Sequence, residues 1–165
     1  MKNASKFIFL AFFSASVSAG GTHDSGHAQM KFSVGEPGTE KADRSIAVSM
    51  SDSMRFNFAP DLGELIHGET IEFKVRNDGN VQHEFSIGNA EDQRKHAKMM
   101  AMMPDMDHKD PNTVSLLPGD SATLSWKFMG KDTVVFSCNL PGHFEAGMNH
   151  SLAIKKAKGE KVAAL

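Results

Sequence analysis

The sequence predicts an all-β protein, an antiparallel β-sandwich with one short helical insert. The first reason is that apolar and polar residues alternate over short stretches from Arg44 onward, as in strands that bury one face. The second is that turn-forming Gly, Pro, Asn and Asp separate these stretches. Several short strands at such spacing are typical of a sandwich, and 165 residues suit one domain of this kind.

Two stretches alternate most clearly. Ile71, Phe73 and Val75 point to one face while the charged residues between them point to the other, and residues 121–128 repeat the pattern. Shorter stretches of the same kind lie at 46–50, 54–58, 81–88, 133–138 and 152–154. The turn sequences between strands are NDGN at 77–80, LPGD at 117–120 and MGKD at 129–132.

Residues 91–103, EDQRKHAKMMAMM, depart from the strand pattern. They are rich in helix formers, begin with acidic residues and stop at Pro104, which predicts one short helix lying across the sandwich. One face of this helix carries a stripe of side chains that could bind metal: His96, Met99, Met103 and, beside them, Met102.

The N-terminus predicts export. Residues 1–19 combine Lys2 and Lys6 with the apolar run FIFLAFF and a stretch of small residues, the layout of a signal peptide. The run is far shorter than the roughly 20 residues of a membrane-spanning helix, so we expect a periplasmic protein without a membrane span. Residues 20–43 are expected to form a flexible His-containing segment, and residues 44–165 the folded domain. The formal net charge of −2 argues against a nucleic-acid partner.

Cys138 is the single cysteine of the chain. Exported proteins usually pair their cysteines, and a bare thiol in an oxidising compartment is open to oxidation. Metal ligation or burial would protect it, so a buried core cysteine is the alternative to a metal site. The spacing that follows favours a metal, because His143 and Met148 continue the cysteine as Cys-x4-His-x4-Met.

Strand parity brings a second histidine to the same region. His83 alternates with the polar residues of its stretch and so faces the apolar interior with Val81, Phe85 and Ile87. Cys138 faces inward by the same count along its own stretch. The loop after the cysteine contains turn residues that can fold it back toward the thiol: Pro141, Gly142 and Gly147.

Two imidazoles, a thiolate and a thioether are the donor set of blue-copper sites. The thiolate and imidazoles serve both oxidation states of copper, and a weak axial thioether favours the reduced ion. Zinc is the rival metal, but Met is a poor ligand for it. The other alternative is a core cysteine with unrelated histidines. His150 could approach the site by its parity with Leu152, although ordinary hydrogen bonding explains such a histidine equally simply.

Residues 44–155 resemble a cupredoxin, through HGETIEFKVRNDGNVQHEF at 67–85 and the Cys-x4-His-x4-Met loop. The resemblance implies a Greek-key sandwich with one type 1 copper bound by His83, Cys138, His143 and Met148. The Met- and His-rich insert at 91–110 and the sequence CNLPGHFEAGM resemble more narrowly the periplasmic copper-tolerance cupredoxins of the CopI type. One departure is Glu84, because many cupredoxins place Asn or Ser there, where it ties the two ligand loops together.

Further copper binding is predicted outside this set. Thioethers select Cu(I), and HAKMMAMMPDMDH at 96–108 holds five of the eleven methionines. The alternative is a helix that packs its methionines on the sandwich, although Met100 lies off the stripe. Two histidines of the N-terminal segment could bind copper or remain solvated. The candidate secondary ligands are His96, Met99, Met100, Met102, Met103, Met106, His108, His23 and His27.

Two functions fit these observations. The first is copper handling, in which a periplasmic protein with a redox-active copper protects the cell. The second is a dedicated electron carrier between periplasmic or membrane partners. The excess of Met and His favours the first, because a pure carrier has no need of it. An enzyme is not expected, because protein ligands fill all four positions, although outer-sphere oxidation of Cu(I) is compatible with such a site. The expected partners are copper ions and a redox or copper-transfer protein, and the expected state is a monomer.

Overall fold

A computed structural model describes residues 32–103 and 110–157 of the chain. Within these ranges lie one helix, α1 (Ala90–Met102), and ten strands. The strands are β1 (Gly35–Pro37), β2 (Arg44–Ser51), β3 (Arg55–Ala59), β4 (Leu65–Ile66), β5 (Thr70–Asn77), β6 (His83–Gly88), β7 (Thr113–Leu116), β8 (Ser121–Phe128), β9 (Thr133–Ser137) and β10 (Asn149–Lys155). No helix of this part of the chain is both long and apolar enough to cross a membrane.

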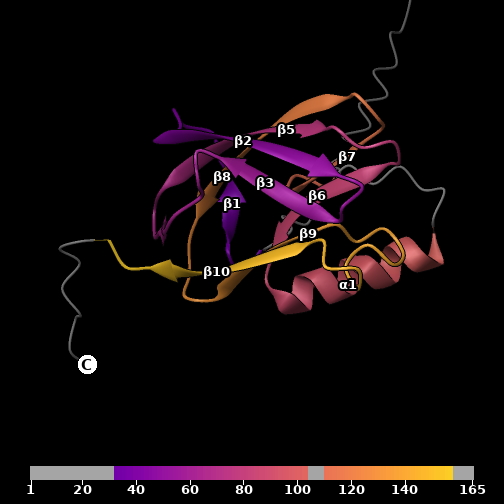
Figure 1. Ribbon diagram of the computed structural model, residues 1–165. Coiled ribbons are helices and arrows are strands. Elements are labelled where there is room, and N and C mark those ends of the chain that lie inside the picture. Colours follow the sequence, from indigo (N-terminus) through magenta and orange to yellow (C-terminus); the bar gives the residue numbers. More distant parts are fainter. Residues whose placement is uncertain (1–31, 104–109, 158–165) are drawn as a thin grey trace, which may run out of the picture. The chain divides into compact units, whose positions relative to one another are not determined.

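The strands form two five-stranded sheets, in the orders β1-β8-β5-β2-β3 and β4-β10-β9-β6-β7. Buried side chains from both sheets make one apolar core, so the predicted β-sandwich is confirmed (Figure 1). Most neighbouring strands are antiparallel, but β2 pairs with β5 and β4 with β10 in parallel. The sequence did not predict these two pairs, because alternation identifies the buried face of a strand and not the direction of its neighbour.

Aromatic rings join the two sheets at the centre of the core. Phe85 of β6 stacks on Phe136 of β9 with ring centroids 5.5 Å apart. Phe73 of β5, in the other sheet, lies 5.3 Å from Phe85 and 5.7 Å from Phe136. The inward parity predicted for these strands is therefore confirmed, and it places the end of β6 and the end of β9 over the same core.

The domain begins earlier than the expected residue 44. β1 pairs with β8, and Val34 is fully buried. The Trp126 indole N–H donates to the Val34 carbonyl at 3.4 Å, and the Phe32 ring meets the Trp126 ring edge-on at 5.2 Å. Residues 32–37 thus belong to the sheet and not to a flexible segment. A three-residue strand is too short to display an alternation that could reveal it.

Helix α1 occupies nearly the predicted span. Asn89 caps it, accepting from the Asp92 backbone N–H at 2.8 Å while the Asp92 carboxylate accepts from the Asn89 N–H at 3.2 Å. The helix packs against β6 and β9, beside the second sheet in Figure 1. Its buried residues are Gln93 and Met100, two turns apart.

The alternative in which the helix packs its methionine stripe on the sandwich does not hold for Met102 and Met103. Met100, expected off the stripe, is 6% exposed, whereas Met102 is 69% exposed and Met103 is also exposed. Helical spacing identified the stripe on one face of the helix, but the face that is buried against the sheet is the one that carries Gln93 and Met100.

Candidate metal centre

His83 is the first residue of β6 and is fully buried. Phe85 and Ile87, which share its parity, are also fully buried, as predicted. Val81 was expected to share this face but is 45% exposed, because it precedes the strand and lies in the 78–82 connection.

The His83 ring has one nitrogen paired and one unpaired. Nε2 lies 3.2 Å from Oδ1 of Asp52, whereas the buried Nδ1 has no hydrogen-bond partner. Because an ionised carboxylate only accepts, Nε2 carries the proton and Nδ1 presents a lone pair. An unpaired buried nitrogen is costly, and a metal ion is the partner that such a lone pair fits.

Asp52 is held in place by the loop before β6. Its carboxylate accepts from the Asn80 backbone N–H and side-chain amide, each at 2.9 Å. These bonds, the backbone one first, lower the pKa of Asp52 to about 2, so it stays ionised. A Cβ at Gly79 would lie 2.2 Å from Asp52 Oδ1, so only glycine permits this approach. Asp52 was not among the predicted site residues, because nothing local marks an aspartate 31 residues before the histidine that it contacts.

Cys138 directly follows β9 and is fully buried. Its Sγ accepts from the Glu84 backbone N–H at 3.3 Å, which links it to the residue after His83. Burial raises the pKa of Cys138 to about 11, so the metal-free thiol is protonated at neutral pH. A metal ion that binds here displaces that proton.

The loop from Cys138 to Met148 closes on itself, as the turn residues predicted. The Cys138 N–H donates to the Met148 carbonyl at 3.1 Å, and the Met148 N–H donates to the His143 carbonyl at 3.0 Å. Gly142 and Gly147 adopt φ of 86° and 101°, a region that favours glycine. Met148 itself is fully buried next to Cys138.

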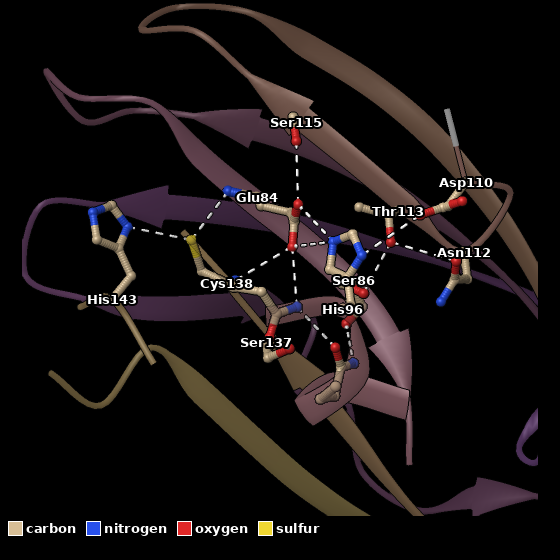
Figure 2. Close-up of polar contacts among 12 residues, drawn as sticks. Glu84, Ser86, His96, Asp110, Asn112, Thr113, Ser115, Ser137, Cys138 and His143 are labelled. Atoms are coloured by element: carbon tan, nitrogen blue, oxygen red, sulfur yellow. Dashed lines mark hydrogen bonds and ion pairs between the residues drawn. The ribbon is translucent and has the colours of Figure 1, made fainter. Parts of the chain in front are cut away.

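His143 completes a cluster of three donors. Its Nδ1 lies 3.3 Å from Sγ of Cys138, and its ring centroid is 5.1 Å from that of His83. One ligand atom from each of these three residues lies within 4.8 Å of the others (Figure 2 shows His143 beside Cys138). Burial and then the neighbouring His83 lower the pKa of His143, which favours the neutral, ligating form.

His150 does not join this cluster. It is exposed, and its ring packs on Phe58 with centroids 5.3 Å apart. Glu145 is also exposed. His150 therefore lies outside the cluster of donor atoms and packs on aromatic rings.

The candidate secondary ligands are dispersed. His96 is engaged with two carboxylates, Met99 is partly buried and Met100 is buried, while Met102 and Met103 are exposed. The expected signal peptide lies outside the described residues. The remaining candidates also lie outside them, namely His23, His27, Met106 and His108.

The sandwich has the same fold as solved cupredoxins. Reduced auracyanin from Roseiflexus castenholzii superposes with a TM-score of 0.54, at 22% identity, over 70% of this chain and 99% of that one. Auracyanin A from Chloroflexus aurantiacus, a "blue" copper protein, superposes with a TM-score of 0.50 at 16% identity, over 67% and 98% of the two chains. The sandwich and its His-Cys-His cluster thus define a class of proteins with the cupredoxin fold.

Sequence comparison narrows the class to one family, although no family model matches the chain. The copper-resistant cuproprotein CopI of Rubrivivax gelatinosus is 38% identical over 147 residues, which cover 86% of this chain and 88% of that protein. The CopI of Vibrio cholerae serotype O1 is 40% identical over 114 residues, covering 69% and 67%. The chain belongs to the CopI family of cuproproteins.

Proposed function

We propose that this protein binds one copper ion of type 1 through His83, Cys138, His143 and Met148, and that it acts in periplasmic copper tolerance. The observation that carries the proposal is the unpaired, buried Nδ1 of His83, which lies within 4.8 Å of the donor atoms of Cys138 and His143. Three donors from two distant parts of the chain converge there without a hydrogen-bonding explanation for that nitrogen.

The donor chemistry supports copper over zinc. A buried Met148 adjoins the cysteine, and a thioether is a ligand for copper and a poor one for zinc. The CopI relatives are named as copper-resistant cuproproteins, which supports the same metal. Copper in such a site would supply one-electron redox chemistry. The chain's own contribution is a closed loop and a histidine whose proton is held by Asp52, so that the donors are positioned before the ion arrives.

A role in copper handling is supported by the exposed thioethers of α1. Met102 and Met103 face solvent next to the residues 104–109, and thioethers select Cu(I). We include in the proposal additional Cu(I) binding by the segment 99–108. Its donors would be Met99, Met102, Met103, Met106 and His108.

The second candidate is a dedicated electron carrier, and the surface around His143 favours it. His143 is only partly buried, and the adjacent Phe144 is an exposed large apolar side chain. A partner that docked on Phe144 would come close to one of the proposed ligands. In this alternative the methionines of α1 have no role in copper binding.

The copper site is tested by titrating the protein with Cu(II) and recording its visible spectrum. We expect an intense thiolate-to-copper band at one equivalent, which Cys138→Ser abolishes and the control His150→Gln retains. Retention of the band in Cys138→Ser would refute the site.

The two functions are separated by Cu(I) binding and copper tolerance. Changing Met99 and Met102 of α1 and the C-cap residue Met103 together to Leu conserves volume, and costs under about 1.5 kcal/mol per site. Copper handling predicts fewer bound Cu(I) ions and lower tolerance when this variant complements a deletion strain. An unchanged stoichiometry of one copper with unaltered tolerance would favour the electron carrier.

A further inference from the structure

The outer face of β6 is buried beneath helix α1, and the residues there are polar. Glu84 is only 1% exposed, although its parity turns it away from the apolar core. The helix contributes Gln93, whose amide donates to the Val135 carbonyl at 2.7 Å and accepts from Asn139 at 2.8 Å. The buried polar residues between sheet and helix are Glu84, Ser86, Gln93, Thr113, Ser137 and Asn139.

The Glu84 carboxylate is the most heavily bonded group of this layer. Both of its oxygens lie 3.1 Å from Nε2 of His96, and Oε2 accepts from the Ser115 hydroxyl at 3.3 Å. Oε1 accepts from the Asn139 backbone N–H at 3.3 Å and from its side-chain amide at 3.1 Å. A buried carboxylate is tolerated only when it is paired and hydrogen-bonded in this way.

His96 supplies the opposite charge from α1. Its side chain is 10% exposed, and Nδ1 lies 3.6 Å from Oδ2 of Asp110 on the far side of the ring. Burial lowers the pKa of His96, but the hydrogen bond and charge of Glu84, together with Asp110, outweigh that effect and raise it above its usual value. The geometry and the surrounding charges therefore both favour an imidazolium.

Of the pair Glu84 and His96, it is Glu84 that contacts the proposed copper ligand Cys138. The Glu84 backbone N–H donates to Sγ of Cys138, and the Glu84 carboxylate accepts from the peptide N–H of Asn139, the residue that follows the cysteine. In Figure 2 the carboxylate lies between the Cys138 sulfur and the His96 ring. Glu84 is not itself among the clustered donor atoms in the described part of the chain.

We propose that Glu84 and His96 form a buried ion pair that positions the Cys138 segment and sets the reduction potential of the copper bound there. The inference rests on the proposed function, because it requires copper on Cys138. A nearby negative charge stabilises the more highly charged Cu(II), and a positive charge opposes it. The two members of the pair therefore act on the potential in opposite directions, with Glu84 nearer to the sulfur. Helix α1, which also bears the exposed methionines, is tied to the copper ligand by this pair.

The test measures the reduction potential of the copper-loaded protein from its visible band. Glu84→Gln keeps the shape of the side chain and removes its negative charge, so the potential should rise. His96→Gln removes the positive charge, so the potential should fall. The double variant should lie between the two single variants. Matched controls remove the half-exposed charge of β5 (Glu72→Gln) and an exposed charge of α1 (Lys95→Gln), and should leave the potential at the parent value.

A purely structural role would not give shifts of opposite sign. If both single variants shift the potential in the same direction, or neither moves beyond the controls, the inference is wrong. If Glu84→Gln no longer holds copper, His96→Gln decides alone, since a fall supports the pair and a rise or no change overturns it. A parent protein without the thiolate band would refute the copper site itself, which is a different failure from a coloured parent with unshifted variants.

Discussion

β5 and β6 follow one another in the chain, and both alternate between apolar and polar residues, yet their polar faces lie in different environments. On β5 the inward Phe73 is buried, and the outward Lys74 is exposed. On β6 the inward Phe85 and the outward Glu84 are both buried, because α1 covers the outer face. Alternation therefore identifies the apolar face of a strand, but it does not reveal what covers the other face.

Because of this difference, a carboxylate on β5 and one on β6 contribute differently to stability. Glu72 on β5 accepts from the Ser45 hydroxyl at 3.0 Å and lies 3.4 Å from Lys74, and both contacts are open to solvent. Glu84 on β6 lies 3.1 Å from His96 Nε2 and accepts from the Asn139 peptide N–H at 3.3 Å, and the Glu84 side chain is buried. Exposed ion pairs contribute little to stability, whereas breaking a buried one leaves its partners unsatisfied.

The largest effect is expected on the apolar side that the two strands share. Phe85→Ala removes the ring that packs between Phe73 and Phe136, and should lower the free energy of unfolding by about 3–5 kcal/mol. Denaturant unfolding of the metal-free protein measures this loss. A loss below about 1 kcal/mol would show that the core closes around the gap, contrary to the packing described.

A smaller loss is expected from Glu84→Gln on the covered face. The substitution replaces an acceptor by an amide that presents donors to His96 and Asn139, and should cost about 1–3 kcal/mol in the metal-free protein. Unfolding in denaturant reports it directly. A neutral result would mean that the layer under α1 rearranges freely or admits water.

The pH dependence that His96 gives to the free energy of unfolding should be a smaller effect than the loss in Glu84→Gln. The pKa of His96 is raised in the folded protein, so its stabilising contribution is complete below its unfolded value near 6.5 and is lost as pH rises through the folded value. The advantage of the parent over His96→Gln in unfolding free energy should therefore be largest below about pH 6.5 and shrink as the pH rises through the raised pKa of His96. Comparing the two proteins cancels groups that they share, such as Cys138. An advantage that grows with pH would contradict an imidazolium paired with Glu84.

The smallest effect belongs to the exposed face of β5. Glu72→Gln should change the free energy of unfolding by less than about 0.5 kcal/mol, since its partners are solvated. The same denaturant series measures it beside Glu84→Gln. If both substitutions lowered the free energy of unfolding equally, the covered face of β6 would contribute no more to stability than the open face of β5.

Much of the candidate metal centre could be predicted from local sequence. Strand parity placed His83 toward the core, and Gly142 and Gly147 indicated the loop that returns His143 to the cysteine. Asp52 could not be found in this way. Its contact with His83 depends on the close packing of the 78–82 connection against the turn after β2, and no local pattern records that approach.

The sequence by itself determined which residues face the core and which loop carries the cysteine, because both follow from the two-residue repeat of a strand and the φ preference of glycine. Only the tertiary structure decided that Glu84 is buried, that Met100 and not Met103 faces the sheet, and that β1 joins β8. Each of these depends on the docking of segments that are separate along the chain. How two segments dock depends on the packing and the hydrogen bonds between both surfaces, so the sequence of one segment does not identify the other.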